Sequence, residues 1–393
     1  MKKIEFEELK ATIGKLEKYI EENQYIGYDP YDALNSPILR KSRSKNTRLF
    51  FTLLLRKSPI NLRKILAVEK GINPKAMGLF LSGYANLYRA GLVESKEKMH
   101  WIFEWLKENY SKGYSGYCWG YNFPWQNRER LLKENTPTVV NTSYVGHAIL
   151  DYHEVAGERE ALDIARSACD FITKDLNITE NEKGICFSYT PVEKNIVHNA
   201  SVLGASLLAR VYSYTKEEEL LNYATKAMNF TVSYQHKDGR WDYSLDAGTG
   251  KPRVQTDWHQ GFIIDSLLWY IEALELDNQK YVKAVEKGAE FYKKQFTSDG
   301  RGYWRYPRLY PINIHNQAQG IITFSKLAKI NSNYLNFAEN IANWTIKNLW
   351  SPHGYFYYQR HRFFTNRIPY MRWSQAWMFL ALSSLIWRVK REK

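Results

Sequence analysis

Cysteine is scarce in this chain, and the three present, Cys118, Cys169 and Cys186, are an odd number without CxxC spacing. This pattern argues for a reducing compartment and against a structural zinc site. No stretch approaches the ~18 consecutive apolar residues of a membrane-spanning helix, and the amphipathic N-terminus lacks the apolar core of a signal peptide. The sequence therefore predicts a cytoplasmic protein without a membrane span.

Acidic residues are outnumbered, with 41 Asp and Glu against 55 Lys and Arg, which gives a net charge of +14. The basic residues are spread along the chain, and no nucleic-acid-binding module is recognisable. We therefore expect no nucleic-acid partner. The charge is explained either by a solvated surface or by attraction to an anion such as an acidic sugar, a phosphate or an anionic lipid.

Aromatic residues are abundant instead: 13 Trp, 29 Tyr and 18 Phe make up 15% of the 393 residues. With 44% hydrophobic and 24% charged residues, the chain has the composition of a globular protein. A hydrophobic core accounts for some of these rings. Many others stand in the stretches between predicted helices, where a core does not explain them.

Two kinds of helix alternate along the sequence. The stretch 256–273 is apolar on nearly every side, as in a helix surrounded by others, whereas 279–296 has one apolar and one charged face. The pair recurs from residue 73 onward. A small residue marks each buried-type helix, namely Gly78, Gly146, Gly204, Gly261, Gly320 and Ala376, with separations of 68, 58, 57, 59 and 56. Near-constant spacing is the signature of repeated supersecondary units.

Six buried-type helices alternate with five amphipathic ones, and the amphipathic N-terminal segment supplies a sixth. The sequence therefore predicts an all-α fold, an (α/α)6 toroid with six inner and six outer helices. Residues 1–72 complete the ring and contribute one connection, with short helices over 48–57 and 58–68; residues 73–393 form the six hairpins of the same domain. An open α-solenoid is the rival, but its repeats are shorter, roughly 34–47 residues, and its connections compact.

The connections of this ring differ by type. Inner-to-outer turns are short, whereas outer-to-inner connections are long and aromatic. In an antiparallel ring these long connections emerge at one end, together with the N-termini of the inner helices, whose free N–H groups favour anions. The sequence therefore predicts a ligand cleft at this end.

Histidines and carboxylates at the starts of the inner helices are the candidates for acid/base catalysis: Asp257, His259, His198 and His315. Polar and aromatic residues of the same end are the candidates for substrate binding: Asp29, Asp32, Trp119, Tyr121, Trp125, Asn141, Tyr144, His147, Asn199, Trp241, Asp242, Trp258, Gln260, Trp304, Arg305, Asn316, Tyr357, Arg372 and Trp373. The bland alternative is that each connection packs its own aromatic rings, that some polar residues cap helices, and that Asp29 and Asp32 shape a turn. Carboxylates around the histidines are too few to favour a metal site, and no cofactor is expected.

Two loops with Asp-Gly shortly before an aromatic residue, Asp238-Gly239-Arg240-Trp241 and Asp299-Gly300 before Tyr303-Trp304, resemble those of the six-hairpin glycosidase superfamily. That superfamily includes glycoside hydrolases, polysaccharide lyases and sugar epimerases of the N-acylglucosamine 2-epimerase type. The stretches GYDPYDAL, SPINLRKIL, INPKAMGLFL, CWGYNFPWQ and TPTVVNTSYVGHAILDY resemble, more narrowly, prokaryotic proteins associated with exopolysaccharide biosynthesis, including VpsJ-like proteins. The resemblance covers most of the chain and implies a role in carbohydrate metabolism, without assigning catalytic residues.

A second likeness is to the QW motif of terpene cyclases, which also have α/α toroids; it runs from Phe230 through Gln235 to Trp241. That motif is structural, and the acid clusters DxDD and DDxxD, which carbocation chemistry and diphosphate binding need, do not occur here. The leading hypothesis is therefore a carbohydrate-active enzyme (hydrolase, lyase or epimerase) acting on an acidic or phosphorylated saccharide in polysaccharide biosynthesis or remodelling. The alternative is a non-catalytic glycan-binding or scaffold protein of a biosynthetic complex.

Overall fold

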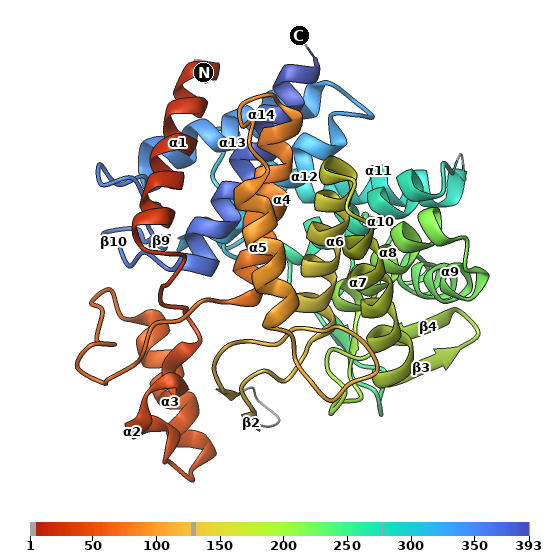
Figure 1. Cartoon of the computed structure of the whole chain (residues 1–393), viewed down its shortest axis with the longest axis horizontal. Coiled ribbons are helices and arrows are strands. Elements are labelled where there is room, and N and C mark those ends of the chain that lie inside the picture. The colour runs from red at the N-terminus through yellow and green to blue at the C-terminus, as the bar shows by residue number, and fades with distance from the viewer. Residues whose placement is uncertain (1–4, 127–130, 277, 393) are drawn as a thin grey trace.

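The computed structural model describes residues 5–126, 131–276 and 278–392, and over these residues the chain forms two concentric rings of helices (Figure 1). The inner ring consists of α4 (Pro74–Arg89), α6 (Val139–Ala156), α8 (His198–Thr215), α10 (His259–Ala273), α12 (Ile314–Leu327) and α14 (Trp377–Arg391), the last preceded by the π-helical turn η3 (Met371–Ala376). Each inner helix packs against the next, and α14 returns to α4. The predicted (α/α)6 toroid is confirmed, and the ring is closed.

The outer ring consists of α1 (Phe6–Glu22), α5 (Glu97–Glu108), α7 (Arg159–Asp170), α9 (Glu218–Ser233), α11 (Gln279–Lys293) and α13 (Asn333–Leu349). A π-helical turn, η2 (Phe171–Asp175), extends α7. Burial explains which helix lies where: α10 buries most of its length, whereas α11 buries one face and exposes its lysines and glutamates. The N-terminal helix α1 packs against α14 and so takes an outer position.

Each long connection after the first is held to the inner helix that follows it by one polar side chain near the start of that helix. Gln260 accepts a hydrogen bond from Trp241 N at 3.0 Å and donates one to Trp241 O at 2.7 Å. The equivalent partners are Thr142 and Trp119, Ser201 and Phe187, Gln317 and Gly302, and Gln375 and Phe356. These side chains replace the partners that extended backbone lacks when it is buried between helices.

Each connection also touches the next outer helix through a glycine. Gly239 has φ +93°, and a Cβ there would lie 2.0 Å from the Lys287 carbonyl oxygen of α11. The same contact joins Gly116 to α7, Gly184 to α9, Gly300 to α13 and Gly354 to Lys15 of α1. Only glycine allows this approach. The glycine of the last connection rests on the first helix of the chain, which closes the outer ring.

Short antiparallel strands form within single connections and, in two small sheets, between neighbouring ones. The pairs are β1 (Trp125–Gln126) with β2 (Leu131–Leu132) and β3 (Ile178–Asn181) with β4 (Gly184–Phe187). The small sheets are β5 (Ile196–Val197), β6 (Ser244–Leu245) and β7 (Pro252–Arg253), and β8 (Ile312–Asn313), β9 (Gln359–Arg360) and β10 (Thr365–Asn366). Since β5 and β8 precede inner helices while their partners come from the following connection, the strands link one repeat to the next.

The first connection protrudes beyond the ring at the lower left of Figure 1 and carries η1 (Asp32–Asn35), α2 (Pro37–Arg40) and α3 (Lys45–Lys57). The helix predicted over 58–68 is wrong, because this stretch forms turns. Tertiary contacts override its helical pattern: Arg63 is drawn inward to Asp32 at 2.7 Å, the Tyr370 hydroxyl at 2.9 Å and the Asp29 carbonyl at 2.8 Å.

Replacing Gln260 with alanine removes both hydrogen bonds to Trp241 and leaves a buried N–H and a buried C=O without partners. We expect the Gln260→Ala variant to lose about 2–4 kcal/mol of unfolding free energy in urea. The exposed Gln279 of α11 offers a matched control, and Gln279→Ala is expected to change stability by less than about 0.5 kcal/mol. Equal stabilities of the two variants would contradict the anchoring role.

Candidate active site

The end of the ring where the inner helices begin, the N-terminal mouth, holds a histidine oriented by a carboxylate. His259 opens α10, and its Nδ1 lies 2.5 Å from Asp257 Oδ1. Gln255 Nε2 donates to the other carboxylate oxygen at 2.8 Å, and Arg305 donates to Gln255 Oε1 at 3.2 Å. Asp257 is buried, whereas the His259 side chain is 15% exposed. A carboxylate that accepts from Nδ1–H sets the tautomer in which Nε2 can take up a proton.

Aromatic rings from five different segments of the chain meet beside this pair. The Trp258 ring lies 5.8 Å from Trp373 and 6.1 Å from Trp304, measured between centroids. Tyr31 in turn lies 5.5 Å from Trp373 and 6.3 Å from Trp125. We call these five residues the mouth cluster. Four of them, Trp125, Trp258, Trp304 and Trp373, are sequence-predicted, and the structure brings them together.

His315 is the second histidine of this end. Its ring lies 4.5 Å from Trp373 and 4.4 Å from Trp377, and neither ring nitrogen has a hydrogen-bond partner within the described residues. Burial, reinforced by the charges of Lys75 and Arg372, holds the pKa of His315 well below its usual range. It is therefore a neutral imidazole near neutral pH, and within the described residues it lacks the carboxylate partner that orients His259.

Two of the predicted carboxylates are already committed to arginines. Asp29 accepts from Arg372 Nε at 2.6 Å and from its terminal nitrogen at 2.9 Å, and the guanidinium lies 4.9 Å from the Tyr121 ring centroid. Asp32 is paired with the buried Arg63. The Asp29–Arg372 pair holds the first connection against η3, and the Asp32–Arg63 pair lies within that connection, with Arg63 also donating to the Tyr370 hydroxyl just before η3. Both carboxylates therefore stabilise the fold in this conformation.

A layer of three rings crosses the ring axis at mid-height. Tyr144 lies 5.8 Å from Phe262 and 5.1 Å from Trp377, and Phe262 lies 5.7 Å from Trp377. On the side of the N-terminal mouth, Lys75 Nζ stands 4.4 Å from the Tyr144 centroid, and burial holds the pKa of Lys75 well below its usual range. Tyr144 and Trp377 also line the cavity on the other side. The layer therefore forms the inner end of this cavity and separates it from the residues of the N-terminal mouth.

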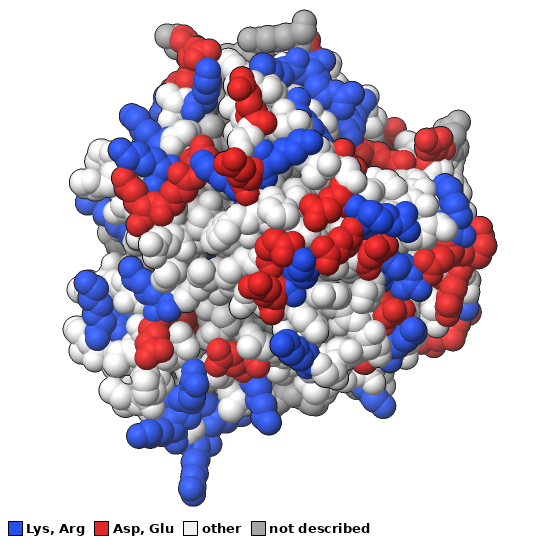
Figure 2. Space-filling model, viewed as in Figure 1, with Lys and Arg blue, Asp and Glu red and all other residues white. Residues whose placement is uncertain are grey.

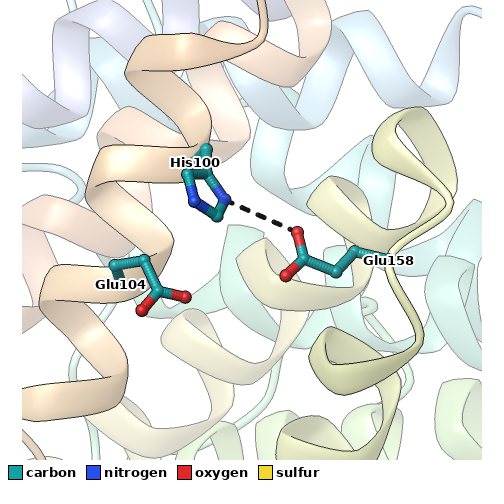
Figure 3. Close-up of side chains that lie close together, drawn as sticks. All are labelled: His100, Glu104 and Glu158. Carbon is teal, nitrogen blue, oxygen red and sulfur yellow. Dashed lines mark ion pairs between the residues drawn. The ribbon is translucent and has the colours of Figure 1, made fainter.

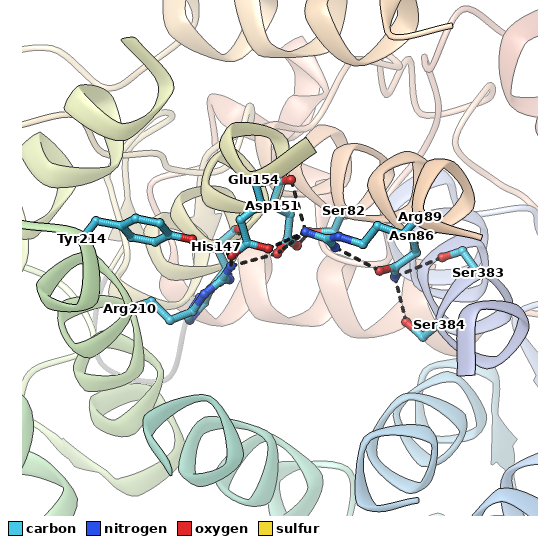
Figure 4. Close-up of polar contacts among 10 residues, drawn as sticks. All are labelled: Ser82, Asn86, Arg89, His147, Asp151, Glu154, Arg210, Tyr214, Ser383 and Ser384. Atoms are coloured by element: carbon cyan, nitrogen blue, oxygen red, sulfur yellow. Dashed lines mark hydrogen bonds and ion pairs between the residues drawn. The ribbon is translucent and has the colours of Figure 1, made fainter. Parts of the chain in front are cut away.

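This cavity has a volume of about 910 Å³ and is lined by the C-terminal halves of the inner helices. It opens at the end of the ring opposite the N-terminal mouth, which we call the C-terminal mouth. Figure 4 shows the polar side chains of one wall, which run from α4 through α6 to α8. Arg210 donates to Asp151 at 3.0 Å, to Glu154 at 2.8 Å and contacts His147 Nδ1 at 3.1 Å. The placement of His147 at the N-terminal mouth is therefore corrected, since it stands two turns inside α6.

Several polar atoms on residues of this cavity have no hydrogen-bond partner within the described residues: Tyr144 Oη, Asp265 Oδ1, Ser325 Oγ and Trp377 Nε1. Buried polar atoms normally find a partner in protein or ordered water. The sequence alone did not predict this cavity. Its signal was present as charged residues at helical spacing within otherwise apolar helices, such as Asp151 and Glu154.

The remaining predicted residues lie in the walls rather than in the mouth. His198 packs outward against Phe230 and Tyr234 of the α9 region, and Asp242 pairs with His236 at 2.8 Å. The wall residues that fix connections or are wholly enclosed are Trp119, Trp241, Gln260, Asn316, Asn141 and Asn199. Tyr357 stands half-buried at the edge, 5.6 Å from the Arg367 guanidinium. For Trp119 and Trp241 the structure supports the alternative in which connections pack their own rings.

A cluster of potential metal ligands lies on the outside, between α5 and the start of α7: His100, Glu104 and Glu158 (Figure 3). His100 Nδ1 stands 3.6 Å from Glu158, whose carboxylate accepts from the Tyr152 hydroxyl at 2.6 Å, and Lys107 neutralises Glu104 at 2.8 Å. These groups therefore have hydrogen-bond or ion-pair partners among themselves and their neighbours. The cluster lies on outer elements of the ring, away from the mouth cluster and the C-terminal cavity.

Solved structures of carbohydrate-active enzymes share this fold. A GH76 α-mannanase from Bacteroides thetaiotaomicron matches with a TM-score of 0.61 and 14% identity, over 81% of this chain and 87% of that chain. A cellobiose 2-epimerase from Bacillus thermoamylovorans matches with a TM-score of 0.62 and 14% identity, over 82% and 88%. A Salmonella enterica protein described as a possible GH105 member matches with a TM-score of 0.63 and 13% identity, over 98% and 94%.

No family model and no curated protein sequence matches the chain. At identities of 13–14% the structural matches establish the architecture. The coarser part of the sequence-based resemblance, to the six-hairpin glycosidase fold, is thereby confirmed.

Buried histidines predict a characteristic dependence of stability on pH. Burial lowers the pKa of His198 from 6.5 to about 4, so between these values the unfolded chain binds a proton that the folded chain does not. This contribution to stability is therefore complete above pH 6.5 and is lost as the pH falls toward 4, by at most about 3 kcal/mol. In His198→Gln we expect a shallower loss, measured by urea unfolding across this range. Parallel pH profiles of the variant and the wild type would contradict it.

Proposed function

We propose that this protein is a carbohydrate-active enzyme that acts on a saccharide at the N-terminal mouth, with His259 as the group that exchanges the proton and Asp257 as its orienting partner. The observation that carries the proposal is the 2.5 Å contact between the two side chains beside the mouth cluster. A partly exposed, carboxylate-oriented imidazole is a competent general base. The aromatic rings around it are suited to the apolar faces of sugar rings.

The surrounding carboxylates favour proton transfer over hydrolysis. Hydrolysis of a glycosidic bond normally uses two carboxylates that face each other across the bond. Here Asp29 is held by Arg372, Asp32 by Arg63 and Asp242 by His236, which leaves Asp257 without a second uncommitted carboxylate among the predicted ones. We therefore assign abstraction of a proton from a carbon next to a carbonyl or carboxylate group, as in epimerisation or elimination.

The two histidines of the mouth have complementary states for such a reaction. His259 is oriented by Asp257, while His315 is neutral, enclosed and without a partner for either nitrogen within the described residues. Both lie against Trp258, at 5.3 and 5.1 Å between centroids. His259 on one side can remove the proton, and the neutral His315 imidazole on the other can donate one hydrogen bond to the oxygen that gains negative charge as the proton leaves.

Arginines at the entrance indicate a negatively charged sugar. Arg253 and Arg305 both donate to Gln255, which in turn holds Asp257, and both arginines are exposed. A carboxylate or phosphate on the saccharide would find them at the edge of the site. The sequence resemblance to exopolysaccharide-associated proteins and the mannanase and epimerase named among the structural matches support a role in polysaccharide biosynthesis or remodelling.

The proposal is tested by following the exchange of sugar C–H hydrogens with D₂O by NMR, on acidic and neutral oligosaccharides. We expect wild-type protein to exchange one position, and His259→Gln and Asp257→Asn to lose about 10²–10⁴-fold in rate, because the base or its orientation is removed. The chain supplies a matched control in the second histidine–aspartate pair, His236 and Asp242, which lies outside the mouth cluster. His236→Gln should retain the wild-type rate.

The same measurement separates the alternative, a non-catalytic glycan-binding or scaffold protein. Calorimetric binding of a saccharide that survives in His259→Gln while exchange is lost supports the enzyme. Binding without exchange or turnover in the wild-type protein, on every sugar of the panel, supports the module and overturns the proposed chemistry.

A further inference from the structure

The positive charge of the protein is concentrated in one place. Residues 36–70 contain ten Lys and Arg but only one acidic residue, Glu69. The stretch 359–367, which forms the β9–β10 hairpin, adds three arginines and no acid. We call these two stretches together the basic lobe. They account for most of the net charge of +14, which corrects the impression from the sequence that the charge is spread evenly.

The basic lobe is one continuous surface. Asn366 of β10 donates to the Ser58 carbonyl that follows α3, at 2.9 Å, which places the hairpin beside the first connection. Most of the cations are exposed: Arg40, Lys41, Arg43, Lys45, Lys57, Lys64, Lys70, Arg360, Arg362 and Arg367. Figure 2 shows one group of Lys and Arg side chains at the lower end of the molecule, where α2 and α3 protrude, and further groups elsewhere on this face.

Large apolar side chains stand exposed among these cations. Phe363 at the hairpin tip is 88% exposed, Ile65 78% and Phe50 of α3 59%. The others of the lobe are Ile38, Leu53, Leu54, Ile60 and Phe364. Half of the exposed large hydrophobic residues of the described chain thus lie on the basic lobe. Exposed apolar groups in this density mark a binding surface rather than a solvated one.

We propose that the basic lobe docks the protein onto the surface of an anionic lipid bilayer. Exposed Phe, Leu and Ile side chains enter the boundary between headgroups and acyl chains, while the surrounding Lys and Arg contact anionic headgroups. The docking is peripheral, since over the described residues none of the helices combines the length and apolar character needed to cross a membrane.

Charge and chemistry select this occupant over the others. A nucleic acid would match the cations but gives isoleucine and leucine side chains nothing to bind, and its recognition uses polar and aromatic groups. A second copy of this chain would bring like charge against like charge, because the lobe is basic throughout. A bilayer with anionic headgroups satisfies both the apolar and the cationic side chains.

Docking also sets the direction of the N-terminal mouth. The first and last long connections, which carry the lobe, emerge at the end of the ring where Asp257 and His259 lie, and Tyr31 of the first connection belongs to the mouth cluster. The mouth would therefore open near the bilayer, as suits a saccharide linked to a lipid. This last step rests on the proposed function, whereas the docking itself does not.

The test is cosedimentation of the full chain with vesicles of equimolar phosphatidylcholine and phosphatidylglycerol, against vesicles of phosphatidylcholine alone. We expect binding to the anionic vesicles only, and release as sodium chloride is raised. The double variant Lys41→Glu/Lys45→Glu should bind at least tenfold more weakly, as should Phe50→Asp/Phe363→Asp, because the two interactions are both required. Thermal unfolding followed by circular dichroism checks that these surface variants fold.

Matched controls come from the other faces of the molecule. Lys283→Glu/Lys287→Glu on α11 makes the same charge change, and Ile330→Asp removes an exposed apolar side chain after α12, outside the lobe. Both should bind vesicles as the wild type does, as should His259→Gln, which separates docking from the proposed catalysis.

The wild-type salt titration keeps the test decisive even where a lobe variant fails to fold. Three results would overturn the proposal: no binding to anionic vesicles at low salt, equal loss of binding in the α11 control, or binding of a duplex oligonucleotide without binding of vesicles.

Discussion

The structure depends on the double fixing of its long connections. Each connection after the first is held to its own inner helix by a polar side chain, as Trp241 is by Gln260, and rests on the next outer helix through a glycine, as Gly239 does. The first contact prevents buried backbone from going unpaired, and the second sets the distance between repeats. Together they turn a row of helical hairpins into a closed ring and leave one end thickly covered by connections.

Closure has a consequence for chemistry, since the two mouths of the ring differ. At the N-terminal mouth the connections contribute aromatic rings that lie beside one histidine–aspartate pair. At the C-terminal mouth the turns are short and the cavity stays open, with basic residues such as Arg89, Lys326 and Arg388 in the last turns of inner helices, where they complement the negative helix ends. The layer formed by Tyr144, Phe262 and Trp377 keeps these environments apart.

The sequence predicted the architecture well because periodicity and glycine spacing report burial directly. It also placed Asp257 and His259 at the start of an inner helix, as the structure has them, with neighbours in space that come largely from predicted connections. It could not tell a ring that fills the wall, such as Trp119, from one that faces the mouth, such as Trp125, because both stand in similar aromatic stretches. Polar residues at helix starts were predicted to bind substrate for a related reason. Gln260 instead forms hydrogen bonds with the Trp241 backbone, and these contacts exist only in the folded chain.

The C-terminal cavity lay beyond such reasoning because it exists only where six helices converge. His147 is an example. It lies two turns inside α6, and this depth places it in the wall of the C-terminal cavity rather than at the N-terminal mouth. The turn at 58–68 shows another: an apolar pattern with Ser and Pro at its start favours a helix, but the contacts of Arg63 outweigh that preference. Long-range ion pairs of this kind leave no trace in local sequence.

Those ion pairs determine how the lobe stands relative to the mouth. Arg63 joins the first connection to the Tyr370 hydroxyl, and Arg372 of η3 returns the contact by binding Asp29 at two points. Breaking a buried ion pair leaves a buried charge without its partner, which is strongly unfavourable. The first connection and the last inner helix are therefore held in one fixed arrangement. Tyr31, two residues after Asp29, thereby becomes part of the mouth cluster, while α3 carries the exposed apolar and basic surface outward. Whatever the lobe binds is consequently held at a set distance and direction from His259.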